Sequence, residues 1–221
     1  AGRRWGLDAK ESGVFVLPPR EKADANLDVY RGTADAISQN IDFIDTYSPD
    51  YLLVLSGDHI YKMNYDKMLQ AHKDNGADAT IAVIEVPMKE ASRFGIMNTD
   101  EEGRIIEFEE KPEHPKSNYC VTGLYFYDNK VVEYAKDLKP SKRGELEITD
   151  LNRIYLENDN LNVELLGQGF TWLDTGTHES LVEATNFVYT IETHQHRKIA
   201  CLEEIAYLNG WISKEDVLEV Y

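Results

Sequence analysis

Apolar runs and helical periodicity alternate along the first third of the chain. Residues 51–55 and 79–84 are mostly apolar and partly β-branched, which predicts strands buried on both faces, as in the middle of a parallel sheet. A third short strand is predicted at 13–17. Apolar positions at helical spacing predict a helix from Thr33, as N-cap, to about residue 47, and another over 64–75. This alternation favours a parallel sheet with right-handed crossovers.

The pattern changes after residue 90. Two short apolar segments flank the turn sequence of Asp100 to Gly103 and predict a β-hairpin over 95–108. Beyond it, strands and helices continue to alternate, so we expect an α/β fold. The further elements predicted are strands at 121–127, 161–166 and 170–173, helices at 130–138, 147–157 and 179–194, and one or two short helices within 201–221.

Length and composition narrow the possible functions. The 221 residues, 29% charged and 42% hydrophobic, are expected to form one domain over 1–221, with a short helical appendage from about 195. A formal net charge of −17 argues against nucleic-acid binding. No apolar stretch approaches about 18 residues, so no membrane span is expected. Cys120 and Cys201 have no partner spacing, which predicts free thiols and a cytoplasmic location.

Two acidic residues follow predicted strands. Asp58 comes after the run 51–55, and Asp174 comes after 170–173. In open α/β sheets, ligands bind outside the carboxyl ends of strands, and carboxylates there are suited to a divalent cation. If the carboxylates of the two residues lie close together in the fold, they indicate a Mg²⁺ site. The alternative is that each acid caps the helix that follows it, and the local pattern leaves both interpretations open.

Two further stretches carry candidate chemistry. Glu110 and Lys111 end a predicted strand and could bind the hydroxyls and the phosphate of a sugar phosphate. A solvated surface ion pair is the commoner interpretation of adjacent glutamate and lysine residues. Thr149 lies near the start of a helix rich in acids, where it could reach a ligand or where helix capping could explain the pattern. The histidines lack the spacing of a zinc site, and no P-loop or dinucleotide-binding glycine pattern occurs.

Longer motifs resemble two related enzyme families. The segments YRGTADA (30–36), LSGDHIYKM (55–63) and ASRFGIMN (91–98) resemble bacterial glucose-1-phosphate adenylyltransferase. From about residue 118, the segments NYCVTGLYFYD (118–128), GELEITD (144–150) and WLDTGTH (172–178) resemble glucose-1-phosphate thymidylyltransferase instead. The change falls near Glu110-Lys111-Pro112, a motif that both families carry. Together the resemblances cover almost the whole chain.

The resemblance implies a fold, a reaction and a set of site residues. The expected fold is a Rossmann-like, three-layer mixed sheet flanked by helices. The expected reaction joins glucose 1-phosphate to ATP or dTTP with Mg²⁺, releasing pyrophosphate, in enzymes that are homo-oligomers. Asp58 and Asp174 resemble the metal ligands and, with Lys111, the catalytic residues. The substrate-binding positions that it implies are Gly32, Gly95, Glu110, Lys111, Val121, Gly123, Thr149 and Trp172.

One family feature is not found in these residues. Both families begin with a first strand and a glycine-rich loop that cradles the triphosphate, and the chain starts downstream of them. We therefore expect weak or no turnover by this polypeptide, and an exposed edge where the first strand would pair. A non-catalytic sugar-phosphate-binding or regulatory fragment is the alternative function.

Overall fold

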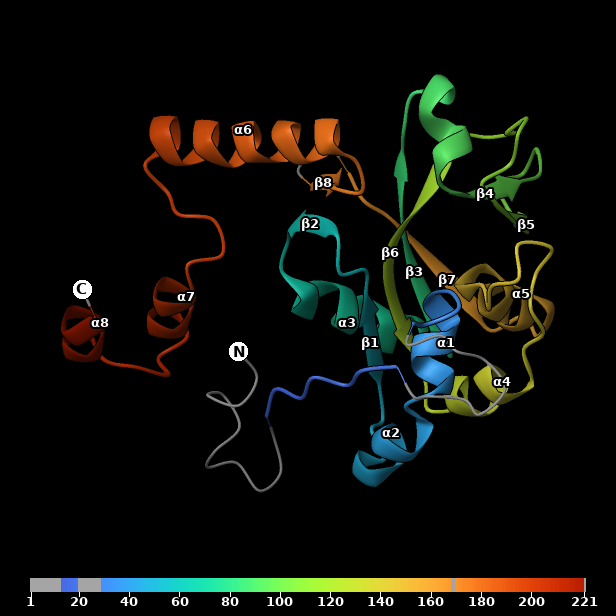
Figure 1. The fold of residues 1–221 in the computed structure, drawn as a ribbon, viewed down its shortest axis with the longest axis horizontal. Coiled ribbons are helices and arrows are strands. Elements are labelled where there is room, and N and C mark those ends of the chain that lie inside the picture. Colours follow the sequence, from blue (N-terminus) through green and yellow to red (C-terminus); the bar gives the residue numbers. More distant parts are fainter. Residues whose placement is uncertain (1–12, 20–28, 168–169, 221) are drawn as a thin grey trace. The chain divides into compact units, whose positions relative to one another are not determined.

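A mixed six-stranded sheet forms the centre of the larger of two units (Figure 1). The computed structural model describes residues 13–19, 29–167 and 170–220. The first unit comprises Ala1–Leu55 and Tyr65–Gly167, and the second comprises Ser56–Asn64 and Gln168–Tyr221. Within the described residues, no helix is long and apolar enough to cross a membrane.

The sheet confirms the predicted mixed α/β fold. Its strand order is β5-β4-β6-β3-β7, with β1 also paired to β6; β3 and β7 are parallel, and the other pairs are antiparallel. The five residues from Ala79 to Val83 are buried, as their largely apolar sequence predicts. The strands are β1 (Leu52–Leu55), β3 (Ala79–Glu85), β4 (Gly95–Thr99), β5 (Ile105–Glu110), β6 (Tyr119–Tyr127) and β7 (Leu161–Leu165).

Strand β1 differs from its prediction. It was expected to be buried on both faces of a parallel sheet, but it pairs antiparallel with β6, and Leu53 and Leu55 are 38% and 40% exposed. A short apolar run cannot distinguish a central strand from a strand at an edge. In the described part of the chain β6 is its one strand partner. Strands β1 and β3 flank β6 and run in the same direction without pairing.

The amino-terminal predictions also need correction. The single helix expected to run to about residue 47 is two helices, α1 (Thr33–Ser38) and α2 (Ile41–Tyr47). The break follows from Asn40, whose side-chain amide donates to the Ala36 carbonyl at 2.8 Å. Gly32, rather than Thr33, is the N-cap. The strand predicted at 13–17 is absent from the described residues 13–19, where Val16 is 75% exposed and has no sheet to cover it.

The remaining helices of the first unit lie close to their predicted positions. Helix α5 contacts β5 and β7, and α3 also contacts β7, so these helices cover the sheet. Gly76, with φ 64°, directly follows α3 and ends it, as expected of a glycine at this position. The helices are α3 (Tyr65–Asn75), α4 (Val131–Asp137) and α5 (Ile148–Glu157), with a 3₁₀ segment, η2, at Met88–Arg93.

The second unit is built on a two-stranded ribbon. Strand β2 (His59–Lys62), which the hydrophobic pattern did not predict, pairs antiparallel with β8 (Thr171–Asp174). Helix α6 (His178–Gln195) follows β8, and α7 (Leu202–Leu208) and α8 (Lys214–Val220) complete the unit (Figure 1).

Candidate functional site

The pairing of β2 with β8 brings Asp58 and Asp174 together. Asp58 directly precedes β2, Asp174 ends β8, and His59 pairs with Asp174 in the register of the ribbon. Beyond the last pair, Thr175 extends the contact, because its backbone N–H and its hydroxyl donate to the Asp58 carbonyl at 3.0 and 2.6 Å. Backbone hydrogen bonds therefore determine where the two carboxylates lie.

Asp58, His59 and Asp174 form what we call the acidic cluster. One potential ligand atom from each residue lies within 4.8 Å of the other two. Two ligands of one ion are separated by at most twice the metal–oxygen distance, which is about 4.2 Å for Mg²⁺ and about 5 Å for Ca²⁺. The ligand atoms of the cluster are thus separated by distances close to the span of one hard divalent cation.

Helix capping does not account for either acid. The N-cap of α6 is Thr177, which forms a reciprocal capping box with Ser180, so the interpretation of Asp174 as a cap is wrong. Asp58 precedes β2 rather than a helix, and the next helix begins only at Tyr65. Both carboxylates instead receive hydrogen bonds from their own loops. The Ser56 hydroxyl donates to Asp58 Oδ1 at 2.5 Å, and the Gly176 N–H donates to Asp174 Oδ1 at 3.0 Å.

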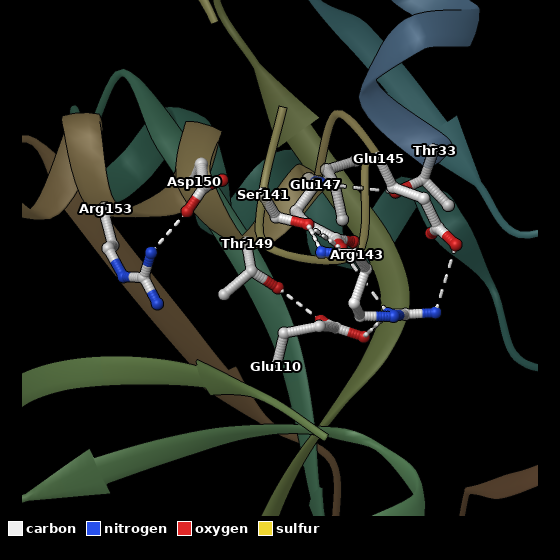
Figure 2. A network of polar contacts seen from close by, with 10 residues as sticks. Thr33, Glu110, Ser141, Arg143, Glu145, Glu147, Thr149, Asp150 and Arg153 are labelled. Carbon is white, nitrogen blue, oxygen red and sulfur yellow. Dashed lines mark hydrogen bonds and ion pairs between the residues drawn. The ribbon is translucent and has the colours of Figure 1, made fainter. Parts of the chain in front are cut away.

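A second group of predicted residues lies in the first unit, and we call it the glutamate cluster: Gly95, Glu110, Val121 and Thr149. The buried Thr149 hydroxyl donates to Glu110 Oε2 at 2.6 Å (Figure 2). Gly95 pairs with Glu110 in the β4–β5 ladder. A Cβ atom at Gly95 would lie 3.3 Å from Glu110 Oε2, 3.7 Å from Thr149 Oγ1 and 3.8 Å from Val121 Cβ. Three different strands and one helix therefore meet at this carboxylate.

Arg143 joins the glutamate cluster to two further acids (Figure 2). Its Nη1 lies 3.8 Å from Glu110 Oε1 and 3.4 Å from Glu147 Oε1, and its Nη2 lies 3.2 Å from Glu145 Oε1. Burial raises the pKa of Glu147, which also accepts from the Ser141 hydroxyl at 3.0 Å. Sequence reasoning singled out this stretch, treated its acids as part of a helix start and gave Arg143 no role; the signal was a single arginine among alternating acids.

The sequence and the fold of this chain are similar to those of known proteins. A family model described as nucleotidyl transferase matches residues 7–190. The chain belongs to the nucleotidyl transferase family. This confirms the resemblance drawn from the motifs.

Two relatives of this nucleotidyl transferase chain correspond to the two resemblances. It is 49% identical over 190 residues to a glucose-1-phosphate thymidylyltransferase from Neisseria meningitidis, covering 86% of this chain and 64% of the relative. It is 51% identical over 186 residues to a glucose-1-phosphate adenylyltransferase from Clostridium perfringens, covering 83% of this chain and 47% of the relative. The chain therefore spans less than two thirds of the length of either relative.

A solved structure also resembles this nucleotidyl transferase chain. A Bacillus anthracis protein described as a glucose-1-phosphate thymidylyltransferase, crystallised with sucrose, superposes with a TM-score of 0.62 at 39% identity. The match covers 72% of this chain and 61% of the other. The mixed α/β fold is thus shared with a family member.

The other site residues that the family resemblance implied do not gather into one group. Lys111 follows β5 with φ 45° and is exposed, and within the described residues its ammonium group forms no ion pair. Trp172 lies in β8, where it contacts His59. The structure thus brings Asp58 and Asp174 together in the second unit, and Gly95, Glu110, Val121 and Thr149 together in the first.

Two of the implied glycines have a backbone reason to be glycine. At Gly32, with φ 102°, a Cβ would lie 2.5 Å from the Leu146 carbonyl oxygen. This close approach is fixed by hydrogen bonds on both sides, from Leu146 N to Arg31 O and from Ala34 N to Leu146 O. Gly123, with φ 73°, lies where the register between β3 and β6 shifts, as is typical of a β-bulge. The ligand contacts that the family resemblance implies for Gly32 and Gly123 would be additional to these backbone requirements.

Sequence spacing did not point to His59. We expected no metal site from the histidines, because none shows zinc-ligand spacing. The structure places His59 Nε2 3.6 Å from Asp58 Oδ1 and 3.8 Å from Asp174 Oδ1. The available signal was its position directly after Asp58.

Proposed function

We propose that this chain takes part in nucleotidyl transfer from ATP or dTTP to glucose 1-phosphate, which yields ADP-glucose or dTDP-glucose and pyrophosphate. Relatives named for both reactions support the substrate class. In this reaction a phosphate oxygen of glucose 1-phosphate forms a bond to the α-phosphorus. The bond from that phosphorus to the oxygen bridging to the β-phosphate breaks, and pyrophosphate leaves with the electron pair.

The observation that carries the proposal is the convergence of Asp58 and Asp174. Two like charges held this close repel each other, by up to about 1 kcal/mol when one of them is 56% exposed to water, so a bound cation offsets a cost that the fold imposes. We propose Mg²⁺, held by these two carboxylates. When bound, it would neutralise charge on the phosphate oxygens around the reacting phosphorus.

The glutamate cluster is the proposed site for the sugar. Glu110 would accept hydrogen bonds from glucosyl hydroxyls, and Thr149 holds its carboxylate in place. The exposed ammonium of Lys111 would pair with the sugar phosphate. In a chain with a net charge of −17, local cations of this kind are needed to attract an anionic substrate.

Pyrophosphate release tests the proposal directly. The chain is incubated with glucose 1-phosphate, Mg²⁺ and either ATP or dTTP, beside the variants Asp58→Asn and Asp174→Asn. Glu183→Gln, an exposed acid on α6, is the matched control. We expect release that depends on glucose 1-phosphate, persists in the control and is lost in both aspartate variants. Release unaffected by both asparagine substitutions would contradict the proposal. The rate of the unmodified chain also tests the expectation of slow turnover by these 221 residues.

A sugar-phosphate-binding role without catalysis is the second candidate. The glutamate cluster lies wholly in the first unit and the acidic cluster wholly in the second, so binding of the sugar phosphate does not require the metal ligands. Calorimetric titration with glucose 1-phosphate and with ATP separates the two functions. Binding of the sugar phosphate alone would favour the non-catalytic role.

A further inference from the structure

His59 contacts both the two acids and an indole ring. Its side chain is 14% exposed, and its Nε2 is the atom that faces Oδ1 of Asp58 and Oδ1 of Asp174. On the other side of the ring, Trp172 Nε1 donates to His59 Nδ1 at 3.3 Å. The two rings meet edge to face, with centroids 5.1 Å apart and an interplanar angle of 84°.

The indole determines which imidazole nitrogen carries the proton. An indole N–H can only donate, so Nδ1 must accept with its lone pair. A neutral imidazole has one N–H group, which therefore lies on Nε2. A protonated Nε2 has no lone pair to give a metal ion, even though its position would suit a ligand.

We propose that Trp172 fixes His59 in the Nε2–H form, and that His59 is a positioning donor for the Asp58 and Asp174 carboxylates rather than a third cation ligand. The proposal rests on the proposed function only in assigning Mg²⁺ to the two aspartates. The Nε2–Oδ1 distances exceed a hydrogen bond, and closing either by about 0.5–1 Å forms one.

The other donors around the cluster support this assignment. The Ser56 hydroxyl and the Gly176 N–H also donate to the Oδ1 atoms of Asp58 and Asp174. His59 is placed to add a donor shared by both acids. Donors that orient metal-binding side chains are part of many metal sites, and their removal lowers metal affinity. A cation held only by oxygen ligands is also expected to be hard, such as Mg²⁺, whereas an imidazole ligand would favour Zn²⁺.

Nuclear magnetic resonance of the ¹⁵N-labelled chain tests the tautomer without any turnover. Long-range ¹H–¹⁵N correlations distinguish a protonated ring nitrogen from one with a lone pair, and His59→Gln assigns the signals. We expect a protonated Nε2 both with EDTA and with Mg²⁺. Trp172→Phe keeps an aromatic ring and removes the donor, so some of the Nδ1–H tautomer should appear beside the Nε2–H tautomer that the facing carboxylates still favour. The control Trp211→Phe changes an indole that is 73% exposed and should have no effect.

Three results would overturn the proposal: a proton on Nδ1 in the unmodified chain, loss of the Nε2 proton when Mg²⁺ is added, or an unchanged pattern in Trp172→Phe. Failure of Mg²⁺ to bind would contradict the metal role in the proposed function, while the EDTA spectrum would still decide the tautomer.

Calorimetric titration with Mg²⁺ separates a donor from a ligand. His59→Gln retains an N–H group near the position of Nε2, so its Mg²⁺ affinity should remain close to that of the unmodified chain. His59→Leu removes the donor and should weaken binding about tenfold or more, the range seen when outer-shell partners of metal ligands are removed. Equal weakening by both substitutions would contradict the donor role.

Discussion

Replacing Thr149 by valine removes one hydroxyl and keeps the shape of a buried side chain. Thr149 is 5% exposed, and its hydroxyl donates to Glu110 Oε2 at 2.6 Å. The other oxygen of Glu110 lies 3.8 Å from Arg143 Nη1, so the carboxylate would remain near one cation. The variant therefore tests what the hydroxyl contributes to the glutamate cluster.

The expected loss depends on whether water can replace the hydroxyl. A hydrogen bond to a charged group contributes about 1.5–3 kcal/mol, but the Glu110 side chain is 23% exposed, and water can reach it in the free chain. We therefore expect the free energy of unfolding to fall by about 1 kcal/mol or less. A bound sugar would exclude that water, so the missing donor should weaken binding by about 1–2 kcal/mol, or about 5- to 30-fold in Kd.

Two measurements check this reasoning. Calorimetry gives the Kd of glucose 1-phosphate, and urea unfolding gives the stability of the same samples. Thr149→Ser keeps the hydroxyl and should bind nearly as well as the unmodified chain. Thr185→Val removes a hydroxyl that donates to a backbone carbonyl on α6 and should leave binding unchanged. Unaltered binding by Thr149→Val would refute the role of the hydroxyl, and equal weakening by serine and valine would show that packing, not hydrogen bonding, is responsible.

Three further predictions test other parts of the structure. Asp58→Asn or Asp174→Asn relieves the repulsion between two carboxylates, of which Asp58 is 56% exposed, so each substitution should stabilise the metal-free chain by up to about 1 kcal/mol. Each substitution should also abolish any rise in Tm on addition of Mg²⁺, and a rise that persists in the variants would contradict the assignment of the two aspartates as ligands. Gly95→Ala places a methyl group in the glutamate cluster and should weaken the binding of glucose 1-phosphate measured by calorimetry. The control Gly167→Ala, whose Cβ would have nothing within 4 Å, should not weaken it. Equal affinities of the two variants would argue against a sugar bound beside Gly95. Burial lowers the pKa of His72 below its ordinary 6.5, so the unfolded chain binds this proton more readily, and the free energy of unfolding should fall as the pH drops through 6.5 toward the folded-state pKa. His72→Asn should flatten that part of the pH profile in urea unfolding, and an unchanged slope would contradict the assignment.

Elements with a strong local signal could be predicted from the sequence. The run 79–84 is apolar at every position except Thr80, and it forms most of the buried strand β3. The turn at Asp100 to Gly103 joins β4 to β5, with Gly103 at φ 81° and Asp100 Oδ1 accepting from Arg104 N at 2.8 Å. In these places the residues that determine the conformation are close in sequence, so pattern and turn chemistry suffice.

Elements that depend on distant partners were missed or wrong. Strand β2 has only four residues and exists because β8, more than 100 residues later, pairs with it. The direction of β1 is set by β6, which its own apolar run cannot reveal. Arg143 approaches Glu110 only when β5 and the start of α5 meet. Each case requires a contact across a long stretch of chain, about which local periodicity carries no information.

The geometry of the acidic cluster depends both on local sequence motifs and on the pairing of distant strands. Motif resemblance identified Asp58 and Asp174 as partners, but their separation depends on the β2–β8 ladder and on the two hydrogen bonds from Thr175 to the Asp58 carbonyl. These bonds are made by the backbone and by Thr175, not by the aspartate carboxylates. Replacing either acid with asparagine should therefore leave the ribbon in place, so that a loss of Mg²⁺ binding in those variants reports on the missing charge rather than on a displaced strand.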